Sequence, residues 1–189
     1  GGVGGAGRVD FYVRAAGGWS RTASVGADHP LVGQAFGHAL ALVGGTTVVG
    51  APGDGGAGPG AGRVFGFGAD GGLRFVLAPP GGLSPTGAPP AGARFGSAVA
   101  ALDSAAMDSA ALAVGVPGRG AVATYLLDAS GQPGAVQIAT GPPGLGFGLA
   151  VAGGRGGLAA GVPWAPSPAV TLFAQRAGGA WTAAGRAAT

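Results

Sequence analysis

The stretch Phe36–Phe67, FGHALALVGGTTVVGAPGDGGAGPGAGRVFGF, decides the fold of this chain. It opens with Phe-Gly, continues through an alternating run and a Gly-Gly turn, and enters a second apolar run that ends in Val49-Gly50-Ala51-Pro52. A glycine-rich loop and a third apolar run follow. Alternation at period two predicts strands, and the short turn between the first two runs predicts that they pair antiparallel.

The same order of features recurs twice downstream, which marks a structural repeat. The Phe-Gly pairs that open a copy fall at residues 36, 95 and 147, and each leads to a Gly-x-Pro motif. Each copy holds about four short apolar runs, as expected for the four-stranded antiparallel sheets that form propeller blades. The residues that carry the motif are Phe36, Gly37, Gly50 and Pro52 in the first copy, Phe95, Gly96, Gly115 and Pro117 in the second, and Phe147, Gly148, Gly161 and Pro163 in the third.

The motif resembles the FG-GAP repeat of integrin alpha-chain β-propellers and of related secreted bacterial and eukaryotic proteins. The Gly-Gly-Trp segment at 17–19 and the segment 178–181 resemble the outermost strand of that repeat. The later copies depart from the pattern, with Val116 and Val162 in place of the motif alanine and Ala160 in place of valine. The resemblance implies an all-β fold of propeller blades, forming a segment of a larger propeller of about seven blades. It names no activity.

The repeat divides the chain into one partial blade and three full ones. We expect residues 1–35 to supply the outer two strands of a blade, and residues 36–94, 95–146 and 147–189 to form one blade each, all within one propeller domain. Propellers close with about four to eight blades, so we expect the rest of the propeller to come from the same or another chain. The expected strands lie near 8–14, 19–25, 37–43, 46–50, 62–68, 73–78, 96–102, 111–115, 120–127, 135–139, 148–152, 157–161, 168–175 and 180–184.

Two stretches could be read in other ways. Residues 100–113 are rich in alanine and could form a helix, but the repeat needs a hairpin there, so we favour a hairpin. Residues 79–94 contain five prolines, which exclude a central strand because proline has no N–H to donate.

The motif residues have predicted structural roles. The motif glycines should end buried strands where neighbouring backbones crowd and no Cβ fits. The motif prolines should stop those strands, and the phenylalanines should pack between sheets.

Composition excludes several functional classes. The formal net charge of +3 comes from ten arginines, with no lysine, against seven aspartates. The arginines are spread along the chain without a basic run, so we expect no nucleic-acid partner. No apolar run approaches about 18 residues, so we expect no membrane span. Without cysteine there is neither a disulfide nor a thiolate metal site.

The sequence contains no pattern that indicates catalysis. Three G-x-G-x-x-G matches precede expected strands, whereas a dinucleotide site needs a following helix. His29 and His38 are the only histidines, and Cys, Glu and G-x-S-x-G are all absent. We therefore expect no enzyme and no catalytic or cofactor-binding residues.

Two positions remain as candidate binding residues. Asp103 and Asp108, with Ser104 and Ser109, could hold calcium in the extended loop of the second copy, although a solvated hairpin loop is the alternative. Trp164 lies in a predicted loop, where it could anchor a protein or stack on a sugar, or instead cover the rim of the propeller. In propellers that resemble this one, ligands bind the loops that map here to 26–35, 51–61, 79–94, 116–119, 140–146 and 162–167.

These observations predict a non-catalytic interaction or adhesion module, secreted or on a cell surface, that presents its loops to a protein or glycan partner. Two alternatives stay open. The chain could be a structural building block of a filament, wall or large assembly, or it could be a lectin-type propeller that binds carbohydrate.

Overall fold

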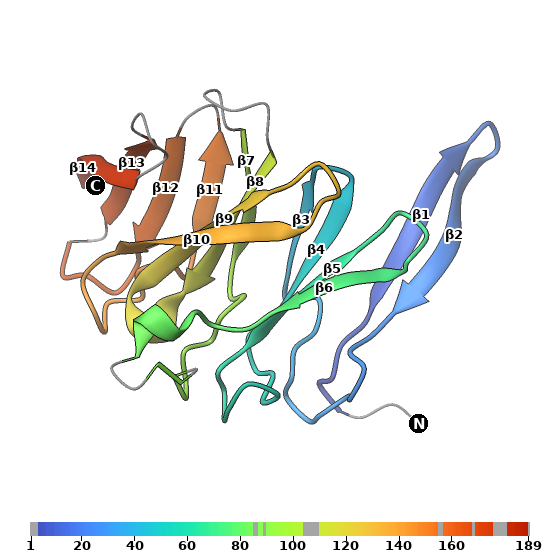
Figure 1. Cartoon of the computed structure of the whole chain (residues 1–189), viewed down its shortest axis with the longest axis horizontal. Coiled ribbons are helices and arrows are strands. Elements are labelled where there is room, and N and C mark those ends of the chain that lie inside the picture. The colour runs from blue at the N-terminus through green and yellow to red at the C-terminus, as the bar shows by residue number, and fades with distance from the viewer. Residues whose placement is uncertain are drawn as a thin grey trace.

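The computed structural model describes residues 4–84, 87–88, 90–103, 110–154, 157–167, 169–175 and 181–188. Its strands form one two-stranded and three four-stranded antiparallel sheets, and the described residues contain no α-helix. Strands that are consecutive in the chain are neighbours in each sheet (Figure 1). The fold is therefore all-β, as the sequence predicts.

The strands are grouped here by sheet. Sheet 1 contains β1 (Val9–Ala15) and β2 (Gly18–Val25). Sheet 2 contains β3 (Ala39–Val43), β4 (Thr46–Ala51), β5 (Arg63–Phe67) and β6 (Leu73–Leu77). Sheet 3 contains β7 (Val99–Asp103), β8 (Ala110–Val116), β9 (Ala121–Leu127) and β10 (Pro133–Thr140). Sheet 4 contains β11 (Val151–Gly154), β12 (Gly157–Val162), β13 (Ala169–Gln175) and β14 (Trp181–Ala188). Two short 3-10 helices, η1 (Gly81–Leu83) and η2 (Pro117–Arg119), lie in connections.

Every expected strand is present within a few residues of its predicted bounds. The described part of the ambiguous stretch 100–113 forms the paired strands β7 and β8, so the preference for a hairpin over a helix is confirmed. The described residues of 79–94 form no strand, as their prolines require. Period-two alternation and turn residues are local signals, which is why the sequence alone locates these elements.

The sheets stack in chain order, and their first strands β3, β7 and β11 contact one another along the stack. Each joint between sheets is filled by a cluster of buried apolar side chains. The stack does not close, because sheet 1 and sheet 4 lie at opposite ends of the molecule (Figure 1). The stacking positions the loops, because each loop connects strands that are held in place by the neighbouring strands and sheets.

The motif glycines make the closest contacts between sheets. A Cβ atom on Gly50 would lie 2.1 Å from the carbonyl oxygen of Gly96, and one on Gly115 would lie 1.9 Å from that of Gly148. Each of these pairs joins the second strand of one sheet to the Phe-Gly of the next sheet. The prediction that backbones crowd at these two glycines is confirmed, because no side chain fits in that space.

The same prediction is wrong for Gly161. The atoms nearest to a Cβ there would be Cβ and O of Ala150, at 3.5 and 3.7 Å, and no backbone from another sheet approaches. The physical reason is that no described residue covers this side of sheet 4. Within its own sheet Gly161 keeps the usual pairing, since its carbonyl accepts a hydrogen bond of 3.3 Å from the N–H of Gly148.

The motif phenylalanines and prolines have the roles that the sequence predicts. All three phenylalanines are buried, and each meets an aromatic ring of the third strand of its own sheet edge to face. β4, β8 and β12 each end one residue before the motif proline. The ring pairs are Phe36 with Phe67, Phe95 with Tyr125, and Phe147 with Phe173.

The residue before each Phe-Gly adopts a left-handed backbone. Its φ is +56° at Ala35, +56° at Arg94 and +74° at Gly146. Non-glycine residues pay roughly 1–2 kcal/mol for this conformation. We therefore expect Arg94→Gly to raise the free energy of unfolding by about 1 kcal/mol, and Arg94→Val to lower it, because a β-branched residue tolerates this region least. Urea titrations of the three proteins measure the effect, and equal stabilities would contradict it.

Candidate functional site

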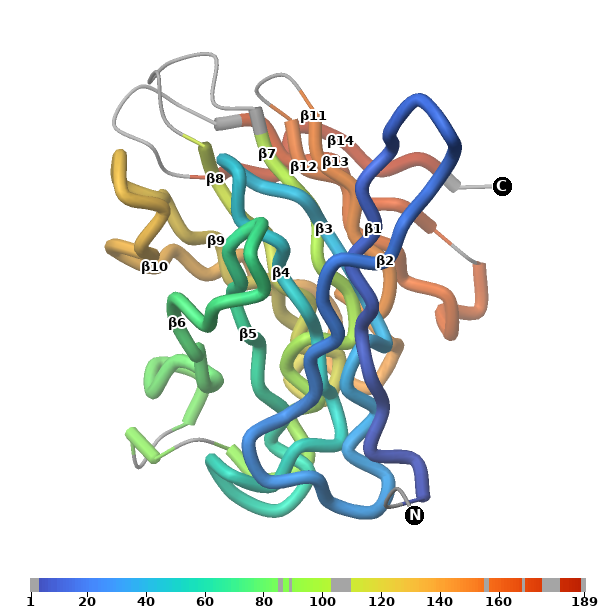
Figure 2. Tube along the Cα trace, turned by 90° about the vertical axis from the view of Figure 1, so that its right-hand side faces the viewer, coloured from blue at the N-terminus to red at the C-terminus, as the bar shows by residue number. Residues whose placement is uncertain are grey.

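The loops that the sequence marks as a binding surface contact one another in pairs. Loops 26–35 and 51–61 lie side by side at the same end of the molecule (Figures 1 and 2). Between them the N–H of Gly53 donates to the carbonyl of Gln34 at 3.2 Å. Gly118 and Ala93 repeat this contact at 3.1 Å in the next copy. We call these loops, with 79–94, 116–119, 140–146 and 162–167, the loop face.

Trp164 takes the place of a glycine on this face. Gly53 and Gly118 follow the motif proline in the first two copies, and a Cβ on either would lie about 2 Å from the carbonyl oxygen of Gly33 or Gly92. In the third copy that position is Trp164, which keeps the backbone contact by donating its N–H to Leu145 at 3.1 Å. The third copy therefore keeps the backbone hydrogen bond of its counterparts while carrying a large side chain where they carry none.

The ring of Trp164 lies against Gly146 and is partly exposed to solvent. A Cβ on Gly146 would lie 3.0 and 3.1 Å from two of its ring atoms, so the indole rests on a residue without a side chain. The residue as a whole is 56% exposed. The structure thus places Trp164 in an exposed turn, as the sequence predicts, on a backbone fixed by hydrogen bonding.

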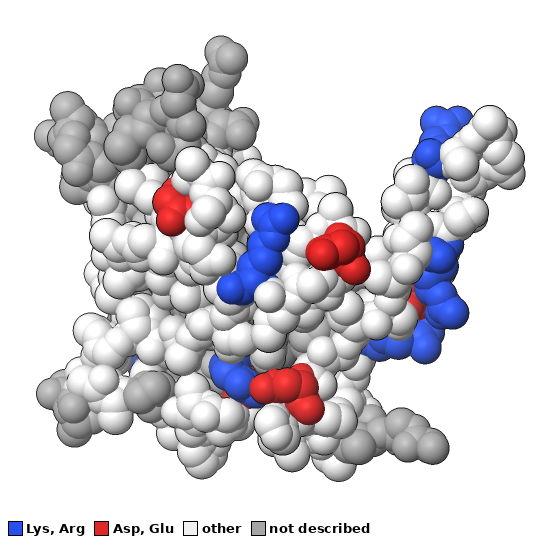
Figure 3. Space-filling view, turned by 45° about the vertical axis from the view of Figure 1, so that its right-hand side comes forward, with Lys and Arg blue, Asp and Glu red and all other residues white. Residues whose placement is uncertain are grey.

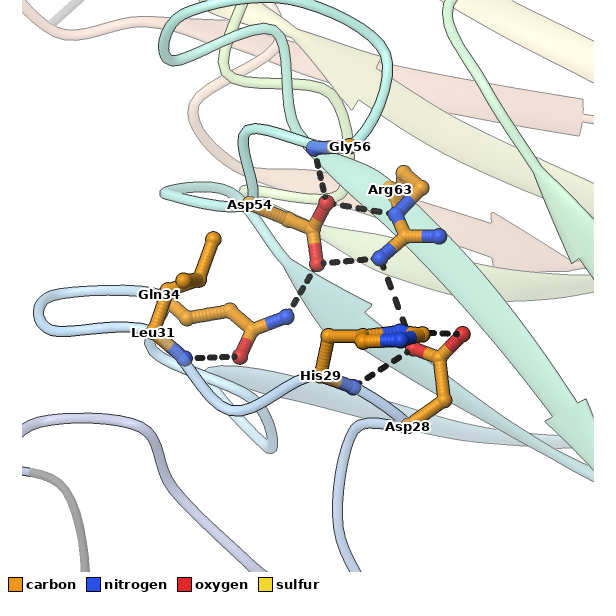
Figure 4. A network of polar contacts seen from close by, with 7 residues as sticks. All are labelled: Asp28, His29, Leu31, Gln34, Asp54, Gly56 and Arg63. Atoms are coloured by element: carbon orange, nitrogen blue, oxygen red, sulfur yellow. Dashed lines mark hydrogen bonds and ion pairs between the residues drawn. The ribbon is translucent and has the colours of Figure 1, made fainter.

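A buried ion pair is the main polar feature of the loop face, and the sequence analysis missed it. The carboxylate of Asp54 is fully buried and accepts hydrogen bonds from Arg63 Nε at 2.5 Å, from Arg63 Nη2 at 3.0 Å and from the Gly56 N–H at 2.8 Å (Figure 4). The side-chain amide of Gln34, also buried, donates to the same carboxylate. Arg63 Nη2 reaches Asp28 as well, at 3.5 Å. The network therefore ties loops 26–35 and 51–61 to β5.

The network keeps Asp54 ionised. Burial by itself raises the pKa of the Asp54 carboxyl, but hydrogen bonds from Arg63, the Gly56 amide and Gln34 outweigh it, so that the pKa lies below its ordinary value. The hydrogen bonds and the charge of Asp54 raise the pKa of Arg63 in turn. Because each Asp54 oxygen already accepts from protein donors, we assign this group the role of holding loops in place.

Both histidines are exposed, and His29 contacts the network through Asp28 at its exposed edge (Figure 4). His29 is exposed and lies 3.3 Å from the carboxylate of Asp28, measured from Nδ1 to Oδ2. His38 is exposed as well.

The structure leaves the calcium hypothesis where the sequence put it. Asp108 lies outside the described residues, and so does the side chain of Asp103, whose backbone ends β7. In the described part of the chain no group of three or more Asp, Glu, His or Cys side chains could hold a metal ion. Asp103 and Asp108 stay a prediction.

On the face shown in Figure 3 the described charged side chains are few and scattered, with several arginines on the protruding β1–β2 hairpin. Two of them, Arg8 and Arg21, lie 3.2 and 3.8 Å from Asp10, which offsets part of their charge. No helix in the described ranges has the length and apolar character required to cross a bilayer.

No family model matches the chain, and no curated protein matches its sequence.

Proposed function

We propose that this chain is a segment of an FG-GAP, integrin-alpha-like β-propeller that acts as a non-catalytic interaction module, secreted or at a cell surface. The support is structural. Three four-stranded sheets stack with their first strands together, and the same Phe-Gly contact recurs at the joints. Such close backbone contacts make a rigid support, which holds exposed loops in the fixed positions that recognition requires.

Trp164 is the observation that carries the proposal. Its large ring is half exposed on the loop face, at a position where the other two copies have glycine. An aromatic side chain on a fixed turn loses little conformational freedom on binding and is a typical anchor for a protein partner or a sugar ring. The partner we propose is a protein or a glycan of the cell exterior.

The test compares two exposed tryptophans. We expect the wild-type protein to bind saturably to at least one member of a panel of purified extracellular-matrix proteins and arrayed glycans. Trp164→Ala should weaken that binding about tenfold or more, the effect expected of an anchor residue. Trp19→Ala is the matched control, because Trp19 on β2 is 69% exposed but lies on the hairpin. We expect it to bind as the wild type does.

The panel distinguishes the forms of the proposal. Binding confined to glycans would select the lectin alternative. Binding that Trp164→Ala leaves unchanged, or a failure to bind any member of the panel, would contradict the role of the loop face. Circular dichroism of both variants should match the wild type, since both side chains are exposed.

A second candidate, a building block of a larger assembly, is favoured by the uncovered side of sheet 4. Val170 is 40% exposed there, whereas its counterparts Val64 and Val122 in sheets 2 and 3 are fully buried. A cavity of about 280 Å³ beside it is lined by Gly161, Ala169 and other small apolar residues. Oligomers that grow with protein concentration, measured by light scattering, would favour this alternative.

A further inference from the structure

Tyr12 in sheet 1 lacks a contact that its three counterparts make. An aromatic residue recurs at one position in the third strand of each repeat, which is β1 in sheet 1. It lies five residues after Gly7, Gly62, Gly120 and Pro168, and is Tyr12, Phe67, Tyr125 and Phe173 in turn. The last three are 4%, 5% and 6% exposed, and the phenylalanine of a Phe-Gly pair packs on each. Tyr12 is 55% exposed, and no described aromatic ring packs against it.

The contact that Tyr12 lacks has the same geometry wherever it occurs. The ring centroids are 6.0 Å apart for Phe36 and Phe67, 6.5 Å for Phe95 and Tyr125, and 6.0 Å for Phe147 and Phe173. All three pairs are edge to face, with interplanar angles of 78°, 81° and 67° in the same order. The ring that would complete Tyr12 is therefore a phenylalanine at the head of a first strand.

The backbone of sheet 1 is open on the same side. In the described residues β1 pairs with β2 alone, whereas β5, β9 and β13 each have a strand on both edges. A groove of about 460 Å³ runs between β1 and β3, lined by residues 9–12 of β1 and 40–42 of β3 with Thr47 of β4. In Figure 3 the hairpin stands away from the body of the molecule on this side.

The opposite wall of the groove is apolar and exposed. Leu40 and Leu42 of β3 are 54% and 76% exposed. Val99, which occupies the position of Leu40 in sheet 3, is 9% exposed because β3 covers it. A first strand placed against β3 would cover both leucines in the same way.

We propose that the groove between β1 and β3 binds a β-hairpin that opens with Phe-Gly and is supplied from outside residues 1–189. Its phenylalanine packs on Tyr12, its first strand covers Leu40 and Leu42, and its second strand pairs antiparallel with the free edge of β1. The register follows from sheet 2, where Gly50 pairs with Val64 and Thr47 with Phe67. In the groove the motif glycine of the hairpin therefore faces Val9, and the residue three positions earlier faces Tyr12. Main-chain pairing supplies affinity, and the phenylalanine supplies specificity.

The chain's own hairpins do not serve as the donor. Phe36, Phe95 and Phe147 are 3%, 0% and 0% exposed, and each is already packed in its own sheet. A second folded copy would have to break one of these joints to offer its Phe-Gly. The inference rests on the stacked sheets and not on binding at the loop face.

The experiment uses a synthetic peptide with the sequence of residues 36–52, FGHALALVGGTTVVGAP, labelled at its C-terminus with a fluorophore. We expect saturable one-to-one binding to the full 189-residue protein, measured by fluorescence anisotropy. Tyr12→Ala should weaken binding about tenfold or more, whereas Tyr12→Phe should keep it, because the edge-to-face contact needs only the ring. A peptide with alanine in place of its first phenylalanine should lose affinity to the same extent.

Further results separate the groove from the loop face and from a second copy. Trp164→Ala should bind the peptide as the wild type does, so failure at the groove and failure at the loop face are told apart. Equal affinity of Tyr12→Ala and wild type, or no peptide binding at all, would overturn the proposal. The protein could instead fail to bind the peptide and form a dimer, detected by light scattering, that Tyr12→Ala dissociates. That result would also overturn the proposal and would assign the groove to a second copy.

Discussion

Gly115→Ala and Gly50→Ala are expected to lower the free energy of unfolding by at least about 3 kcal/mol each, because the added methyl group meets backbone that cannot move aside. Its carbon would lie 1.9 Å from the Gly148 oxygen in the first variant and 2.1 Å from the Gly96 oxygen in the second. Both oxygens belong to the Phe-Gly that leads into the next sheet, so relief requires that the sheets separate and expose the apolar joint between them.

The third copy provides the matched control. Gly161 has the same place in the repeat and in its strand, but the nearest atom to an added Cβ is 3.5 Å away. We expect Gly161→Ala to change the free energy of unfolding by no more than about 0.5 kcal/mol. Urea unfolding followed by tryptophan fluorescence measures all three variants. Equal effects at Gly115 and Gly161 would show that strand propensity, and not contact between sheets, explains the glycine.

Arg63→Ala is expected to lower the free energy of unfolding by about 3–5 kcal/mol at neutral pH, because it leaves the carboxylate of Asp54 buried without its counter-charge. Asp54 is fully buried, and Arg63 provides two of its four hydrogen bonds. Arg74→Ala is the control in the same sheet. Arg74 is exposed and donates one hydrogen bond of 3.0 Å to Thr46, so its loss should cost about 1 kcal/mol or less.

The pH dependence should change sign in the Arg63 variant. In the wild type the pKa of Asp54 lies below its ordinary value of 3.8. The contribution of Asp54 to the free energy of unfolding is therefore complete above pH 3.8, and it is lost as the pH falls through the pKa of the folded state. Without Arg63, burial should hold the pKa above the ordinary value. The folded variant then binds a proton more readily than the unfolded chain, and its stability should rise as the pH falls from 7 toward 4. Denaturant titrations at pH 7 and pH 4.5 distinguish the two slopes; parallel slopes would show that Asp54 is not electrostatically coupled to Arg63.

The candidate site was less accessible from the sequence than the fold. Gln34, Asp54 and Arg63 are separated by 20 and 9 residues, and no motif links them, so only the stacking of loops on β5 brings them together. Trp164 could be singled out as a loop aromatic. The sequence did not show that Trp164 occupies the position of a glycine that contacts a neighbouring loop. The contacts of Gly53 and Gly118 in the structure show it.

The sequence by itself determined the strands, their order and the burial of Phe36, Phe95 and Phe147, because alternation, glycine, proline and phenylalanine act on their immediate neighbours. Only the tertiary structure decided which residues at the same position of the repeat also make the same contacts. Gly161 and Tyr12 follow the repeat as closely as Gly115 and Tyr125 do, yet their contacts are absent from the described chain. The physical reason is that a contact between sheets needs residues of the adjacent sheet, and the sequence of one repeat does not show whether an adjacent sheet is present.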